Sequence, residues 1–389
     1  MSIDAKPNSP SPDVSGPHAG VLLTGAAQSR RLREAGLYDS AGQPLPYCDI
    51  VSDELTTVPA DRVQIPDDAK LIRGSVLFAG LVLEQFGHVL LNSLGRLWAL
   101  EQLPKDTRLL FMPKRRAARK HYPHLRPVLD SLGIGNEFFL SKGPFAFEEV
   151  YLATDLFGER FGGLGAERFF DWLDRKWPAP GPVERGRKIY VTRSRLGAKF
   201  GRFAAEEHLE QLLIAQGYEV FAPEQHELKT QLSLFQRAER LIFAEGSALH
   251  LYAMVRRADQ RVVVIQRRDT LPKLIKTQLA ARPGRQIKAI HVLKELYWPP
   301  RRSDHLSVAL LDFDRLREEL VAANMIRADA RWVAPTYSQE RDSLNAGLEP
   351  GQKMLDHRGR RVFLSAIRSG ADWSSAQAAA QGETKSGTS

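Results

Sequence analysis

Short apolar runs alternate with stretches of helical periodicity throughout the second half of the chain. The runs KIYVT, LIFA and VVVI, at 188–192, 241–244 and 262–265, have the length and composition of buried strands. The stretches between them repeat apolar residues at intervals of three and four, the spacing of a helix that covers a sheet. This alternation predicts a parallel α/β sheet with open crevices at its strand ends.

The complete pattern of the second half predicts a Rossmann-like domain, because right-handed crossovers join successive parallel strands. The expected strands are 188–192, 218–221, 241–244, 262–265 and 287–292. The expected helices are 205–216, 228–238, 248–255, 274–281 and a last amphipathic helix at 312–325.

The first half carries a weaker pattern that also predicts an α/β domain. Its expected strands are 75–78, 109–112, 137–140 and 150–153. Its strongest helical pattern covers 85–103 and ends before Pro104, because proline cannot continue a helix. A second helical pattern covers 114–132, and two internal prolines can split it.

A proline- and glycine-rich segment, Pro178–Gly186, is the clearest linker signal in the chain. We therefore expect an N-terminal α/β domain at 19–180 and a C-terminal Rossmann-like domain at 186–295, followed by a helical extension at 296–373. The polar ends of the chain, 1–18 and 374–389, are expected to be disordered tails.

The composition restricts the kinds of partner and the cellular location that we expect. The 389-residue chain has 55 Lys and Arg against 46 Asp and Glu, and its formal net charge of +9 favours an anionic partner. Its single cysteine, Cys48, excludes an intrachain disulfide and fits a reducing compartment. No signal peptide and no apolar run of ~18 residues is recognisable. We expect a cytoplasmic protein that can rest peripherally on the inner face of the cell membrane.

Missing motifs exclude several classes of protein. The chain has no Walker lysine motif, no G-x-G-x-x-G and no G-x-S-x-G elbow, which argues against kinases, dehydrogenases and serine hydrolases. It has no recognisable nucleic-acid-binding module, so no nucleic-acid partner is expected. No Asp-x-Asp pair stands at a strand end, and we therefore expect neither a metal nor another cofactor.

A basic loop follows the strand 188–192. Arg193 closes the strand, and Arg195, Lys199 and Arg202 follow within the loop. Guanidinium groups at the carboxyl end of a parallel strand can bind phosphate oxygens in a bidentate fork. The loop predicts a phosphate site, although an exposed loop paired with nearby glutamates would show the same pattern.

A second candidate site is the turn after the strand 241–244. Gly246 allows close approach of a ligand to the backbone, while Ser247 can cap the helix that begins near Ala248 and direct its free N–H groups at an anion. Glu245 is suited to ribose or sugar hydroxyl groups, and His250 lies within the first helical turn. We expect this turn and the basic loop to occupy neighbouring strand ends.

A histidine in the first half is a candidate general base. His88 lies near the start of the expected helix 85–103, and Asn92 and Arg96 follow at helical spacing on the same face. A neutral imidazole suits proton abstraction near neutral pH. A partly buried structural histidine is the alternative, and Glu84 is an alternative carboxylate base.

The order of these motifs resembles glycosyltransferase family 61, often described as capsular polysaccharide biosynthesis proteins. In that family an N-domain helix carries a His, an Asp and Pro-Arg-Leu, where this chain has His88, Asn92 and Gly95-Arg96-Leu97. The similar positions after Lys188 are Arg193, Ala205–Glu206, Pro223–Glu224, Gln231, Ala238–Glu239, Gly246–Ser247 and Leu249.

The resemblance implies a GT-B fold, with two Rossmann-like domains facing a cleft, and an inverting, metal-independent transfer from a nucleotide-sugar donor. The acceptor, a glycan or lipid-linked glycan, would lie on the side of Asn92 and Arg96, and His88 or Glu84 would take its proton. The implied donor-binding residues are Arg193, Arg195, Arg202, Glu206, Glu245, Gly246, Ser247, Ala248 and His250.

Four positions depart from the family's pattern. Asn92 replaces an Asp, Gly95 a Pro, Ala205 an Asn and Glu245 a common His. These departures keep two alternatives open. One is a catalytically degenerate nucleotide- or sugar-binding protein, and the other is a basic scaffold that binds anionic surfaces through residues 114–120.

Overall fold

The chain divides into two compact units. The computed structural model describes residues 13–27, 31–115, 118–159, 164–197, 200–299, 306–348 and 352–380. Unit 1 comprises the described residues up to Pro180 together with 250–256 and 273–282, and unit 2 comprises the other described residues. Within the described ranges, no helix is long and apolar enough to cross a membrane.

Unit 2 contains a five-stranded sheet with the order β10-β8-β11-β12-β13, and all its neighbouring strands are parallel. Its strands are β8 (Glu184–Val191), β10 (Glu219–Phe221), β11 (Ala238–Ala244), β12 (Arg261–Ile265) and β13 (Lys288–Ile290). All five strands expected from the sequence are therefore present. The chain leaves β8 toward β10 on one side and returns to β11 on the other, so a topological switch point lies between β8 and β11.

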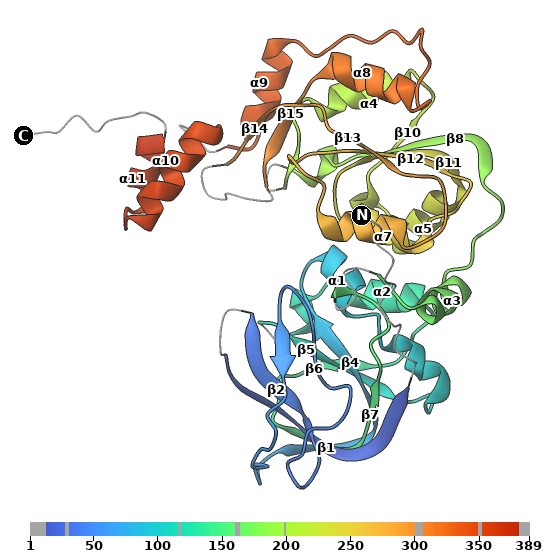
Figure 1. The fold of residues 1–389 in the computed structure, drawn as a ribbon, viewed down its shortest axis with the longest axis vertical. Coiled ribbons are helices and arrows are strands. Elements are labelled where there is room, and N and C mark those ends of the chain that lie inside the picture. Colours follow the sequence, from blue (N-terminus) through green and yellow to red (C-terminus); the bar gives the residue numbers. More distant parts are fainter. Residues whose placement is uncertain are drawn as a thin grey trace, which may run out of the picture. The chain divides into compact units, whose positions relative to one another are not determined.

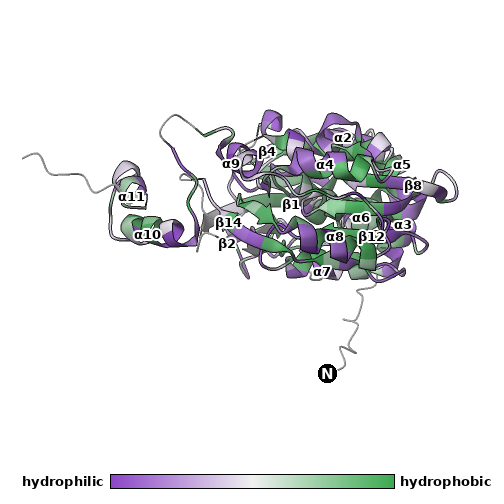
Figure 2. Ribbon diagram, turned by 90° about the horizontal axis from the view of Figure 1, so that it is seen from above, coloured by the Kyte–Doolittle hydropathy of each residue, from purple (hydrophilic) through white to green (hydrophobic). Residues whose placement is uncertain are grey.

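The five helices expected from the sequence in the second half of the chain are also present. They are α4 (Glu206–Ile214), α5 (Leu228–Arg237), α6 (Ala248–Val255), α7 (Lys273–Ala280) and α8 (Phe313–Ala322). Leu209 of α4 and Leu316 of α8 share a buried cluster with Ile242 of β11, and both helices cover one face of the sheet (Figure 1). The next strand residue, Phe243, points to the opposite face and contacts Phe235 of α5. In Figure 2, α4 and α8 carry both hydrophobic and hydrophilic residues, as amphipathic helices on a sheet do.

The C-terminal part of unit 2 differs from the helical extension that we expected. It contributes β14 (Leu293–Tyr297) and β15 (Val308–Leu311), which form a separate sheet with β9 (Arg202–Phe203) in the order β14-β15-β9. Its helices are α9 (Tyr337–Asn345), α10 (His357–Arg368) and α11 (Trp373–Ala380). Residues 374–380, expected to be disordered, are helical because Ala376 packs into a small core with Leu355 and Phe363. Residues 381–389 lie outside the described ranges.

Unit 1 is built on a seven-stranded mixed sheet with the order β3-β2-β1-β7-β4-β5-β6. Its strands are β1 (Val14–Ala27), β2 (Leu32–Tyr38), β3 (Thr56–Val58), β4 (Lys70–Val82), β5 (Arg108–Pro113), β6 (Phe138–Leu140) and β7 (Phe145–Ala153). The four strands expected here are β4 to β7, which pair in parallel, while β1 is antiparallel to both its neighbours.

The expectation of disorder at 1–18 is wrong for Val14–His18, which belong to β1. Val14 pairs with Ala153 and Ser15 with Leu152 at the end of β7. The Pro- and Ser-rich composition does not reveal this pairing, because the partner strand lies far away along the chain. Residues 1–12 lie outside the described ranges.

The long helix expected at 85–103 is interrupted. The α-helices of unit 1 before Pro180 are α1 (Phe86–Asn92), α2 (Leu125–Ser131) and α3 (Glu167–Lys176), and a 3₁₀ helix covers Leu97–Gln102. Helix α7 and most of α6 also belong to unit 1. Ser93 Oγ donates a hydrogen bond to the carbonyl of Leu81 on β4. A Cβ atom on Gly95 would lie 1.9 Å from Oδ1 of Asp155. Tertiary contacts at these two small residues therefore break the helical pattern.

Candidate functional site

The carboxyl ends of β8 and β11, on either side of the switch point, bring Arg193 and Gly246 together. Val191 and Phe243 are paired in the sheet, so the residues after them leave it side by side. A Cβ atom on Gly246 would lie 2.1 Å from Nη1 of Arg193 and 3.0 Å from its Cζ. The guanidinium group thus lies directly against the backbone of the turn, and a side chain at position 246 would displace it.

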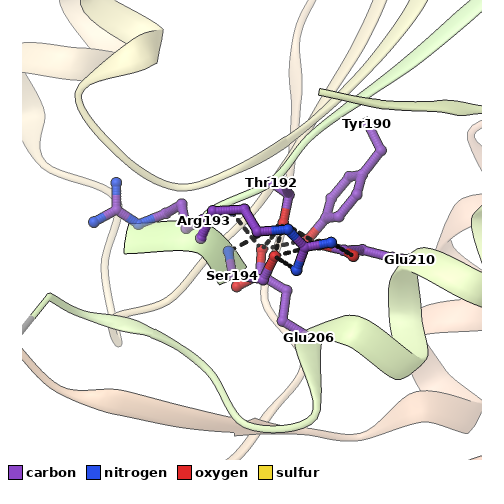
Figure 3. A network of polar contacts seen from close by, with 7 residues as sticks. Tyr190, Thr192, Arg193, Ser194, Glu206 and Glu210 are labelled. Atoms are coloured by element: carbon purple, nitrogen blue, oxygen red, sulfur yellow. Dashed lines mark hydrogen bonds and ion pairs between the residues drawn. The ribbon is translucent and has the colours of Figure 1, made fainter. Parts of the chain in front are cut away.

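A buried carboxylate holds the backbone of Arg193. Oε1 of Glu206, the first residue of α4, accepts hydrogen bonds from the N–H of Arg193 at 2.8 Å and from the hydroxyls of Tyr190 at 2.9 Å and Thr192 at 3.0 Å (Figure 3). At the other end of the side chain, Nε of Arg193 donates to the carbonyl of Gly201 at 3.0 Å. These bonds leave the Arg193 guanidinium little freedom to move.

Burial makes the ionised form of Glu206 unfavourable. The residue is almost fully buried, and its Oε2 has no hydrogen-bond partner among the residues that the structure describes. Burial raises the pKa of Glu206, while the hydrogen bonds to Oε1 and the charge of Arg193 act in the opposite direction. Glu206 therefore holds the backbone of Arg193 in place, although the desolvation of its own carboxylate is unfavourable.

Arg195, which we expected to bind the donor, belongs to the same hydrogen-bond network and lies at its exposed edge. Glu210, one turn after Glu206 on α4, accepts a hydrogen bond from the hydroxyl of Ser194 (Figure 3). Its Oε1 also lies 2.6 Å from the hydroxyl oxygen of Thr192, whose single proton is shared between Glu206 and Glu210. Oε2 of Glu210 accepts from Nη2 of Arg195 at 3.0 Å. The Arg195 guanidinium is thus exposed and already paired.

Two arginines that the sequence analysis did not assign to the site lie beyond the end of β12. The carboxylate of Glu245 is fully buried, and it accepts hydrogen bonds from the backbone N–H of Arg267 at 2.9 Å and from Nε of Arg268 at 2.5 Å. Glu245, expected to bind ribose or sugar hydroxyls, therefore has its oxygens engaged within the protein. Arg267 and Arg268 follow β12 as Arg193 follows β8, so the same strand-end rule would have found them.

The side chain of Arg267 is buried beside other positive charges. Its Nη1 donates to the backbone and side-chain oxygens of Ser307 at 3.1 and 3.2 Å. Its Nε has no hydrogen-bond partner within the described part of the chain. Burial, reinforced by the charge of Arg193 and then of Arg268, lowers the pKa of Arg267 to about 9. A bound anion would offset both the burial and the repulsion.

The turn after β11 presents the start of a helix. Ser247 is exposed, and α6 begins at the following Ala248. The first N–H groups of a helix have no acceptor inside it and favour an anion. His250, also expected at the donor, contacts Oε1 of Gln278 on α7 through Nδ1.

Arg202 lies elsewhere than the predicted phosphate site. It is buried, and its Nη2 donates to the carbonyls of Ser343 at 2.8 Å and Ala346 at 3.2 Å, at the C-terminal end of α9. A guanidinium group there satisfies carbonyls that have no partner inside the helix. Lys199 of the same loop lies outside the described residues.

His88 lies on α1 in unit 1, with a carboxylate beside it. Its Nδ1 is 3.7 Å from Oε1 of Glu159, and 31% of its side chain is exposed. Glu84, the alternative base, is exposed just before α1. The sequence analysis missed Glu159, because no local pattern links it to a histidine so distant along the chain.

The other two acceptor-side residues have contacts within unit 1. Nδ2 of Asn92 donates to the carbonyl of His88 at 3.2 Å. Arg96 is not on the helical face with them, because α1 ends before it. Its guanidinium is buried, and it donates to Oδ2 of Asp155 at 3.1 Å and to the carbonyl of Asp49 at 2.8 Å. Arg96 therefore stabilises the fold of unit 1.

No metal-binding cluster is apparent in the described ranges, where no three His, Cys, Asp or Glu side chains are placed to hold an ion.

Residues 86–264 match the family described as Glycosyltransferase 61. The match spans just under half of the chain and assigns a glycosyltransferase family 61 domain to this segment. The protein is accordingly a glycosyltransferase, with a donor sugar and an acceptor glycan as its general partners. No curated protein matches the chain.

The matched segment contains His88, Arg193 and Gly246, and the structure explains two further positions of the family pattern. Nε2 of Gln231 on α5 donates to the carbonyls of Pro223 and His226, at 2.8 and 3.0 Å, and so holds the turn after β10. Ala205 adopts φ of 52° just before α4. Asn, common in the family at this position, tolerates this left-handed conformation better than Ala does.

Proposed function

We propose that this glycosyltransferase transfers a sugar from a nucleotide-sugar with inversion and without a metal ion, and that unit 2 binds the donor's diphosphate. The observation that carries the proposal is the Arg193 guanidinium lying against Gly246 at the switch point of a parallel sheet. Open α/β sheets bind ligands at this point, outside the carboxyl ends of the strands.

Guanidinium groups gather at the switch point. Arg193, Arg267 and Arg268 interact electrostatically with one another and with the carboxylates of Glu206, Glu224 and Glu245. The pKa of Glu206 is raised, and Nε of Arg267 has no hydrogen-bond partner within the described residues. A diphosphate would accept hydrogen bonds in the fork geometry of guanidinium groups and offset the burial of Arg267.

The same arginines would assist the chemical step. As the bond between the anomeric carbon and the diphosphate oxygen breaks, the departing nucleoside diphosphate gains negative charge. Fixed guanidinium groups stabilise that charge without reorganising, which is how they would take the place of a metal ion. The network around Glu206 keeps Arg193 in position for this role.

Unit 1 would supply the base and present the acceptor. In this proposal His88 takes the proton of an acceptor hydroxyl, and the oxygen attacks the anomeric carbon from the face opposite the leaving group, which inverts the configuration. Glu84 is the alternative base. The proposal includes a GT-B plan, a glycan or lipid-linked acceptor, and a cytoplasmic role in capsular or surface polysaccharide synthesis, peripherally at the membrane.

The test is turnover of a panel of UDP-, GDP- and dTDP-sugars, measured as release of the nucleoside diphosphate. We expect Arg193→Ala to lower kcat/KM by roughly thirtyfold or more, the equivalent of about 2 kcal/mol for the loss of one oriented donor. Thermal shifts with the same panel identify the nucleotide, since a ligand at ~100 times its Kd adds about 2.7 kcal/mol of stability.

Arg261→Ala is the matched control. Arg261 begins β12, at the amino end of the strand whose carboxyl end leads to Arg267, and its guanidinium donates to the carbonyl of Asn324. The control variant should keep the turnover of the wild type. Unchanged turnover in Arg193→Ala would remove the switch point from the mechanism.

A further inference from the structure

A carboxylate next to His88 is held in place by groups on a different segment of unit 1. Oε2 of Glu159 accepts hydrogen bonds from the backbone N–H of Asp53, at 2.7 Å, and from the hydroxyl of Ser52. The Glu159 side chain itself is only 4% exposed, although Asp53, which donates one of these bonds, lies at the surface. Both donors use Oε2, which leaves Oε1 directed toward His88 at 3.7 Å from Nδ1.

The imidazole of His88 has one hidden nitrogen and one accessible side. Nδ1 is buried and has no hydrogen-bond partner within the described part of the chain. Since 31% of the side chain is nevertheless exposed, Nε2 is the nitrogen left to meet a substrate. Hydrogen bonds at catalytic histidines are often long without substrate and tighten when it binds.

We propose that Glu159 is a positioning residue, which holds His88 with a proton on Nδ1 and a free electron pair on Nε2. This inference rests on the proposed function, in which His88 is the base. It adds a residue that the sequence analysis did not find and explains why the histidine needs a buried carboxylate on its hidden side.

The proton transfer is balanced within this arrangement. Nε2 of His88 takes the proton of the acceptor hydroxyl as the oxygen forms its bond to the anomeric carbon. The bond to the diphosphate oxygen breaks, and its electron pair leaves with the nucleoside diphosphate. The proton on Nδ1 stays in place and faces Glu159, whose negative charge stabilises the imidazolium ion.

Other charged groups also lie near His88. The charge of Glu54 interacts with it, but the Glu54 carboxylate is bonded to Nζ of Lys114, and that hydrogen bond is the largest cause of its lowered pKa. Arg31 contributes to the same lowering. Glu54 is thus a carboxylate of the same neighbourhood whose partner is a lysine, which makes it a matched control.

The test is Glu159→Gln, assayed by nucleotide release from the UDP-, GDP- and dTDP-sugar panel. The N–H of Asp53 keeps the amide oxygen, so the amide NH₂ faces Nδ1 and favours the wrong tautomer of His88. We expect kcat to fall on the order of a hundredfold. KM for the donor should stay unchanged, and the acidic limb of the pH–rate profile should move to lower pH. Glu54→Gln should keep the kcat of the wild type.

The double variant with His88→Ala separates positioning from a general structural effect. Because Glu159 acts through His88, Glu159→Gln should cause no further loss in the His88→Ala background. A wild-type kcat in Glu159→Gln, or an equal loss in both backgrounds, would overturn the inference and leave the proposed function standing. A wild-type kcat in His88→Ala would overturn the inference and the base assignment. No turnover by the wild-type chain on the panel would overturn the proposed function, and the inference with it.

Discussion

At the scale of single residues, the candidate site depends on which group each charged side chain contacts. Arg193 and Arg202 both belong to the basic segment that follows β8, yet Arg193 lies against a glycine while Arg202, at the start of β9, binds the end of a helix. Glu206 shows the cost of such an arrangement. It fixes Arg193 through Oε1 while its other oxygen is buried without a partner in the described ranges.

Glu206→Gln should change how the stability of the protein depends on pH. Burial raises the pKa of Glu206 in the folded state above its ordinary value of 4.5, so the folded state binds the proton more tightly than the unfolded state. The contribution of Glu206 to the stability of the wild-type protein therefore falls as the pH rises from 4.5 through the raised pKa. Glutamine cannot ionise. The free energy of unfolding of the Glu206→Gln variant should therefore increase relative to that of the wild type over this pH interval.

Urea unfolding over a pH series from acid to neutral measures this effect. Glu207→Gln is the control, because Glu207 is the next residue of α4 and is exposed. The control should follow the pH dependence of the wild type. If Glu206→Gln also runs parallel to the wild type, the burial of Glu206 has no electrostatic cost.

At the scale of elements, unit 2 follows its sequence pattern closely and unit 1 does not. The helices and parallel strands of unit 2 bury long, regular apolar stripes, and such periodicity is visible locally. In unit 1, β1 lacks that pattern, and α1 ends at Asn92 because Ser93 and Gly95 make contacts with β4 and Asp155. The local periodicity of apolar residues does not reveal such contacts.

The residue before α4 has a strained backbone conformation, and a substitution can relieve that strain. Ala205 adopts φ of 52°, where a side chain costs about 1–2 kcal/mol. Glycine has no such cost but loses more entropy on folding, so Ala205→Gly should raise the free energy of unfolding by about 0.5–1 kcal/mol. Chemical denaturation checks the change. Ala204→Gly, at the buried neighbouring position without positive φ, should instead destabilise the protein. Equal destabilisation by both variants would contradict the assigned conformation.

At the scale of the whole molecule, one residue reports on the packing of unit 1. Cys48, the single cysteine of the chain, is buried in the core against one face of the mixed sheet. Burial raises the pKa of its thiol, so the reactive thiolate is scarce as well as inaccessible.

Alkylation of Cys48 by iodoacetamide should therefore be at least roughly tenfold slower in the native protein than in urea, at the same pH. Mass spectrometry of the intact chain gives the rates. Cys48→Ala should remove the labelling altogether. Equal rates in the native and unfolded protein would show that unit 1 does not keep Cys48 in its core.

The sequence by itself determined the strands and helices of the second half of the chain, the family, and the two residues that meet at the switch point. Regular apolar spacing and short motifs at strand ends are local properties, so they can be read along the chain. Only the tertiary structure decided the strand order, and with it which strand ends are neighbours. It also placed Arg267 and Arg268 beside Arg193, directed Arg202 and Arg96 to structural contacts, and set Glu159 against His88. These contacts join residues from different elements, whose spacing along the chain carries no signal of their meeting.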